Sequence, residues 1–105
     1  MKFLITESKL NSIVSMYLDN QDFKKIFYGT NVYFVNSEKD EYAQIKFNYT
    51  SKWCTINRGL MDEVANFFSL TNIDSISSID EWVKNKLDDN PRTVDVEREI
   101  IVRYF

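Results

Sequence analysis

Apolar and polar positions alternate most regularly in the stretch from Val32 to Asn57. Successive side chains of a β-strand point to opposite faces, so this alternation predicts strands with one apolar and one wet face. In the central run the apolar positions are Ala43, Ile45, Phe47 and Tyr49, separated by Gln44, Lys46 and Asn48. Shorter runs rich in aromatic and β-branched residues flank it at Val32–Asn36 and Trp53–Ile56. Because the connections are too short for parallel crossovers, the stretch predicts an antiparallel meander.

Apolar residues at three- and four-residue spacing predict helices on both sides of the meander. The first helix begins at a cap on Thr6 or Ser8, ends near Asp19-Asn20, and has the apolar positions Leu10, Ile13, Val14, Tyr17 and Leu18. The second is capped by Asn57 and contains Leu60, Met61, Val64, Phe67 and Phe68.

A third helix is predicted from Ser78, which forms a capping box with Glu81. It follows a polar connection over Thr71–Ser77 and stops before Pro91, which cannot continue a helix. Trp82 is the largest residue on its apolar face. We therefore expect Trp82 to anchor this helix to the sheet.

Residues 22–28 fit either a helical turn or a strand that enters a hairpin. Gly29 and Asn31 both tolerate positive φ, so a turn at this point and a preceding strand are favoured.

The carboxyl-terminal segment Thr93–Phe105 is predicted to form one long strand. One face holds Val94, Val96, Ile100, Val102 and Tyr104, with Arg98 as a polar intruder. The opposite face carries Asp95, Glu97, Glu99 and Arg103 together with Ile101 and Phe105. The complete pattern predicts a single α+β domain over residues 1–105. Its antiparallel sheet comprises a meander of three or four strands plus the long terminal strand, with about three helices packed on one face.

Composition narrows the chemistry that this domain is expected to perform. Apolar residues make up 44% of the chain, which predicts a packed core. The chain has no histidine and one cysteine, Cys54, so the usual general base, the common nucleophile pairs and a structural zinc site are missing. Cys54 lies in a strand pattern, where a buried and inert thiol is favoured over a reactive one.

Pairs of carboxylates occur at four places, where they could serve acid–base chemistry or hold magnesium. All four places are turns or helix ends, which explain the carboxylates without a catalytic role. These groups are the triplet Glu38/Asp40/Glu41 and the pairs Asp62/Glu63, Asp80/Glu81 and Asp88/Asp89. We expect no enzyme activity, no catalytic residue, no metal site and no cofactor.

The net charge of −3 argues against general electrostatic binding to nucleic acid. A local stacking platform for a single strand remains an alternative, formed by aromatic residues and lysines of the meander. Its members would be Tyr33, Tyr42, Lys46, Lys52 and Trp53. No apolar run approaches the length of a membrane span, and the apolar stretch in MKFLITESKL is too short for a signal peptide. These two features predict a cytoplasmic protein.

The opening MKFLITESKL, the run YFVNSEKDEYAQIKF and the later WCTIN resemble small uncharacterised proteins of tailed bacteriophages. The resemblance covers about the first half of the chain and carries no functional motif. It implies a phage accessory protein that acts in the cytoplasm of a bacterial host. With no catalytic residue set, the expected function is stoichiometric binding of a host or phage protein, for example inhibition of a host defence or of a host takeover target. Nucleic-acid binding is the alternative.

The end of the terminal strand is apolar on both faces, which suits either a central strand or an edge that pairs with another chain. In the second case Ile100, Val102, Tyr104 and Phe105 are the expected binding residues, with Tyr104 and Phe105 as anchors. The partner would be a second copy, forming a homodimer, or the target protein.

Overall fold

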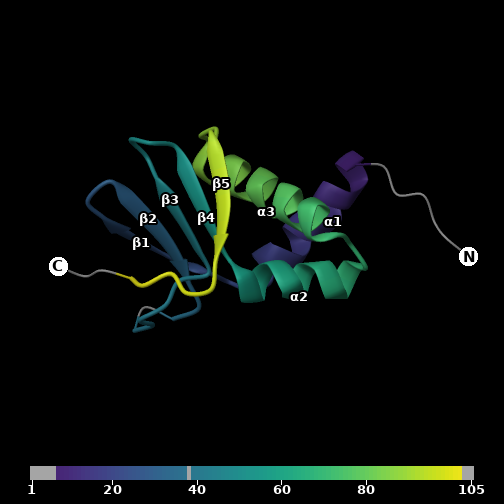
Figure 1. The fold of residues 1–105 in the computed structure, drawn as a ribbon, viewed down its shortest axis with the longest axis horizontal. Helices are drawn as coiled ribbons and strands as arrows, with labels where there is room; N and C mark the ends of the chain where they lie inside the picture. Colours follow the sequence, from purple (N-terminus) through teal and green to yellow (C-terminus); the bar gives the residue numbers. More distant parts are fainter. Residues whose placement is uncertain (1–6, 38, 103–105) are drawn as a thin grey trace, which may run out of the picture.

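The computed structural model describes residues 7–37 and 39–102, and it has the expected α+β architecture. Figure 1 shows the helices gathered beside a twisted sheet, while the segment after β5 runs below the strands and away from the helices. The elements in chain order are α1 (Glu7–Asp19), β1 (Lys24–Tyr28), β2 (Asn31–Val35), β3 (Ile45–Asn48), β4 (Trp53–Asn57), α2 (Arg58–Phe68), α3 (Asn72–Leu87) and β5 (Thr93–Glu97). Among these described residues no helix is both long enough and apolar enough to cross a membrane.

The meander is confirmed. The five strands lie in the order β1-β2-β3-β4-β5, and the pairings β1–β2, β2–β3 and β3–β4 are antiparallel. The strand favoured within residues 22–28 is also confirmed, as β1. It turns into β2 through Gly29-Thr30, between the paired residues Tyr28 and Asn31. Gly29 has φ +61°, a conformation that glycine adopts without steric cost.

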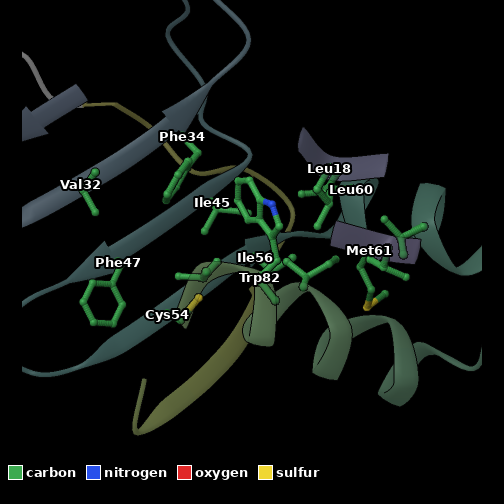
Figure 2. Close-up of a cluster of buried hydrophobic side chains, with 14 residues drawn as sticks. Leu18, Val32, Phe34, Ile45, Phe47, Cys54, Ile56, Leu60, Met61 and Trp82 are labelled. Carbon is green, nitrogen blue, oxygen red and sulfur yellow. The ribbon is translucent and has the colours of Figure 1, made fainter. Parts of the chain in front are cut away.

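The main core lies between the sheet and the helices (Figure 2). Alternate residues of the strands face this core, and α1 and α2 contribute Leu18, Leu60 and Met61. The strand residues are Val32, Phe34, Ile45, Phe47, Cys54 and Ile56. Trp82 of α3 is only 4% exposed and packs its ring on Phe34, with 5.2 Å between ring centroids. The expected anchoring position of Trp82 is therefore confirmed.

The predicted start of the third helix is wrong. Helix α3 begins at Asn72, and the Oγ1 of its N-cap Thr71 accepts a hydrogen bond from the backbone N–H of Asp74 at 3.1 Å. Ser75 and Ser78 are buried inside the helix, where the Ser75 hydroxyl donates to the carbonyl oxygen of Met61 at 2.7 Å. Small polar residues thus occupy the face along which α3 packs on its neighbours. Because these positions are polar, the sequence pattern predicts a loop where the helix in fact runs.

The second helix begins at its predicted cap. The Asn57 Oδ1 accepts a hydrogen bond from the backbone N–H of Leu60 at 3.3 Å. Leu60, Met61 and Val64 are buried, whereas Phe67 is 66% exposed.

The prediction of a long terminal strand is also wrong, both in the length of the strand and in its orientation. Strand β5 ends at Glu97 and runs parallel to β4, because α2 and α3 together form a crossover long enough to return the chain in the same direction. The last pair joins Asn57 to Glu97. Since α2 begins at the next residue, Arg58, β4 offers no further backbone for β5 to pair with.

After β5 the chain crosses to the helix-free face of the sheet. The Asn57 side-chain amide donates to the carbonyl oxygen of Arg98 at 3.0 Å where the chain leaves the sheet. Backbone hydrogen bonds of 2.8 Å then join Ala43 N–H to Ile100 C=O and Val102 N–H to Glu41 C=O. Ile100 and Val102 therefore do not share a face with Val94 and Val96, contrary to the prediction for a single strand.

A second, smaller core forms on this helix-free face. It contains Tyr33, Val35, Ala43, Ile100 and Val102. The expected common face of Ala43 with Ile45 and Phe47 is wrong, because β3 begins only at Ile45. Ala43 precedes the strand and packs on the opposite side.

Candidate functional site

The helix-free face of the sheet carries a groove of about 680 Å³. All five strands contribute to its floor, and the segment after β5 forms one of its sides with Glu99, Ile100 and Ile101. The helices cover the other face, so the groove lies where the sheet has only partial cover from its own chain.

The strand register arranges the floor of the groove in rows. One row crosses four strands as Tyr33, Lys46, Thr55 and Asp95, each residue paired with the next. Paired side chains lie on the same face of a sheet about 4.5–5.5 Å apart, so these four point into the groove side by side. The neighbouring row contains Asn31, Asn48 and Trp53.

An exposed indole ring dominates the apolar part of the groove. Trp53 is 45% exposed and has no helix over it, and Ile101, which also lines the groove, is 52% exposed. Tyr33 and Thr55 lie deeper and are buried. The groove therefore combines a buried floor with two exposed apolar side chains.

Acidic groups prevail among the charges of the groove. Its lining includes one lysine, Lys46, and three carboxylates, Asp95, Glu97 and Glu99, an excess of two negative charges. Lys46 forms no ion pair within the described part of the chain, since no carboxylate oxygen there lies within 4.0 Å of its ammonium nitrogen. The Oδ1 atom of Asp95 is buried and has no hydrogen-bond partner among the described residues. A buried acceptor without a donor is costly, so this oxygen lowers the stability of the local structure.

Asn48 belongs to the groove wall as a structural residue. Its side-chain amide donates to Thr30 Oγ1 at 3.0 Å and Asn31 Oδ1 at 2.9 Å. Its Oδ1 accepts the backbone N–H groups of Thr50 and Ser51, both at 2.9 Å. The first two bonds hold the start of the β3–β4 turn against the β1–β2 turn, and the other two order the β3–β4 turn itself.

The proposed stacking platform for nucleic acid does not assemble on one surface. Tyr33, Lys46 and Trp53 share the groove, but Tyr33 is buried and offers no exposed ring. Lys52 instead contacts Asp89, with 2.6 Å between Nζ and Oδ2. That hydrogen bond from Lys52 lowers the pKa of the Asp89 carboxyl. Tyr42 is exposed and pairs with Ile101 through an isolated bridge.

The binding residues expected at the carboxyl terminus have different environments. Ile100 and Val102 are buried in the second core, with 4% and 6% of their surface exposed. Tyr104 and Phe105 lie outside the described residues. A binding role for these four stays a prediction, and the described pair contributes mainly by holding one side of the groove.

The single thiol is buried on the other side of the sheet. Cys54 has no exposed surface, and burial raises the pKa of its thiol to about 12, with the charges of Asp80 and Asp95 adding to the effect. A thiol with such a pKa stays protonated at neutral pH and is a poor nucleophile. No group of three or more potential metal ligands was found within residues 7–37 and 39–102.

Sequence reasoning did not identify Asp95 as part of the same site as Lys46 and Trp53. The available signal was the alternation of Val94 and Val96 with Asp95 and Glu97, which places both carboxylates on one face. The parallel register with β4 decides that this face is the groove.

Comparisons with known proteins give no relative for this chain: no family model matches it, and neither a curated protein nor a solved structure matches it.

Proposed function

We propose that this chain acts by stoichiometric binding of another protein, and that the groove on the helix-free sheet face is its contact surface. The observation that carries the proposal is the exposed indole of Trp53 inside a groove of about 680 Å³ that is also lined by charged groups. Exposed aromatic side chains within a concave surface are typical anchors of protein interfaces. The buried, protonated state of the thiol supports binding over nucleophilic catalysis.

The resemblance to phage proteins refines this proposal. The partner is then a bacterial host protein, such as a component of a defence system or a target of host takeover, and the chain acts in the bacterial cytoplasm. Inhibition is the simplest consequence of such binding, because a small domain seated on a partner covers a surface that the partner needs.

Nucleic-acid binding has less support from the geometry. A strand of phosphates in the groove would face three carboxylates and one lysine. Titration with single- and double-stranded oligonucleotides at low salt should therefore leave the indole N–H NMR signal of Trp53 unchanged. Binding that perturbs Trp53 and weakens steeply with salt would favour the nucleic-acid alternative.

Affinity capture with groove variants tests the proposed function. A tagged copy is expressed in bacteria, and captured proteins are quantified for the native chain, Trp53→Ala and Ile101→Asp. Ile73→Asp is the matched control, because Ile73 is 78% exposed and lies on α3, away from the groove. Circular dichroism confirms that each variant is folded.

We expect at least one protein to be captured by the native chain and by Ile73→Asp, and to be lost with both groove variants. A set of captured proteins that is the same for all four chains would contradict the proposal.

A further inference from the structure

We infer that the groove receives an arginine side chain of the partner protein, with the guanidinium group held between the Trp53 indole and the Asp95 carboxylate. This inference rests on the proposed function, since it names the chemistry of the segment that the groove binds. The occupant is a segment of a protein chain that presents arginine.

The register of β4 and β5 places the two recognition groups at a suitable separation. Trp53 pairs with Thr93, and Thr55 pairs with Asp95, so Trp53 and Asp95 are diagonal neighbours on the same face. Diagonal neighbours lie about 7–8 Å apart, within reach of one long side chain. Thr55, which pairs with Asp95 and is the next residue on the same face of β4 after Trp53, is small and buried and lines the groove.

The chemistry of the two groups favours arginine. A guanidinium group is planar and stacks on an indole face, while its N–H donors reach a carboxylate at the same time. Asp95 lines the groove, and a guanidinium N–H that reaches its carboxylate forms a hydrogen bond between charged groups, which is stronger than one between neutral groups. Glu97 and Glu99 also line the groove and add to its negative potential.

Lys46 determines which charge the bound segment can carry next to the arginine. It lies on the other side of Thr55 from Asp95 in the same row. A second positive charge on the ligand at that position would be repelled, whereas a carbonyl or carboxylate oxygen would be accepted. This asymmetry disfavours a polyamine, which carries positive charge at both ends.

The test uses N-acetyl-arginine N-methylamide as the probe and the two tryptophan indole N–H signals of the isotope-labelled protein as reporters. Trp53 reports on the groove. The Trp82 indole is an internal reference, because it is buried and donates to Asp19 Oδ1 at 3.0 Å. The acetylated methylamide of citrulline, a neutral analogue of arginine, is the ligand control.

We expect the arginine probe to shift the Trp53 signal and the β5 amides, to leave Trp82 unchanged, and to bind at least about tenfold tighter than the citrulline probe. Asp95→Asn should weaken arginine binding by about tenfold. Glu97→Gln should weaken it by a smaller factor, and Asp62→Asn should have no effect, since Asp62 is an exposed carboxylate on α2 outside the groove. An unchanged Trp82 signal in each variant shows that the fold is intact.

Several results would overturn the inference. The first two are equal affinity for the arginine and citrulline probes and loss of arginine binding in Asp62→Asn. The other two are tighter binding of spermidine at the same position and a shift of the Trp53 indole signal that is caused by self-association of the protein. Capture of a partner that depends on Trp53 but is insensitive to Asp95→Asn overturns this inference alone. Capture that ignores every groove variant overturns the proposed function, and the inference with it.

Discussion

Trp82→Ala should remove a large part of the stability of this domain. The ring is 4% exposed and packs against Phe34 at 5.2 Å and Phe23 at 5.8 Å between centroids. Replacing a buried tryptophan with alanine costs about 3–5 kcal/mol through lost burial and the cavity left behind. The indole N–H also donates to Asp19 at 3.0 Å, but this carboxylate is 47% exposed, so water replaces much of that bond. A domain of this size has a stability of roughly 5–15 kcal/mol, so a loss near 4 kcal/mol is severe.

Urea unfolding followed by far-ultraviolet circular dichroism measures this loss, because the backbone signal does not depend on the deleted fluorophore. Trp82→Phe retains most of the packing and should cost about 1–2 kcal/mol. Trp53→Ala is the matched control, and its cost should be well below that of Trp82→Ala because the Trp53 ring is 45% exposed. A cost below about 1 kcal/mol for Trp82→Ala, or one no greater than that of Trp53→Ala, would refute the packing argument.

Three further predictions concern chemistry and local structure. Cys54 should react with a thiol reagent only as fast as the protein opens, because the thiol is buried and its pKa is raised to about 12; rapid labelling of the native protein would contradict this. The hydrogen bond from Lys86 and then that from Trp82 lower the pKa of Asp19, so its stabilising effect is present above the ordinary pKa of about 4 and is lost as pH falls below it. Asp19→Asn should therefore flatten the dependence of the urea midpoint on pH between about 5 and 3, and an unchanged slope would argue against the ion pair. Asn57→Ala should cost about 1–2 kcal/mol, because it removes both the α2 cap and the bond to the Arg98 carbonyl, whereas the exposed Asn85→Ala should be neutral in the same unfolding experiment.

The parts of the fold that follow from the sequence are those in which local pattern and tertiary packing agree. The meander is predictable because alternation identifies each strand and the connections are too short for any other pairing. The start of α3 is not predictable from large apolar residues, since Ser75 and Ser78 are buried against other helices. Their hydroxyls donate hydrogen bonds to the Met61 carbonyl oxygen and to Asn11 Oδ1. The length of β5 is likewise decided elsewhere in the chain, at the residue where β4 ends.

The candidate site follows from the sequence only in part. Alternation places Lys46 and Asn48 on the wet face of one strand, and Asp95 and Glu97 on a common face of another. That these faces are the same face depends on the parallel register of β4 and β5, which no local pattern reports. The exposure of Trp53 is equally nonlocal, because it depends on which side of the sheet the helices cover.

One local feature, the N-cap at Asn57, connects the fold to the groove. Because α2 begins at Arg58, β4 ends at Asn57, and β5 has no pairing partner beyond Glu97, the residue paired with Asn57. The chain must then leave the sheet, and the Asn57 amide satisfies the Arg98 carbonyl at the point of departure. The segment that follows buries Ile100 and Val102 on the helix-free face and brings Glu99 and Ile101 to one side of the groove. The residue that starts a helix on one face of the sheet thereby helps to shape the proposed binding surface on the other.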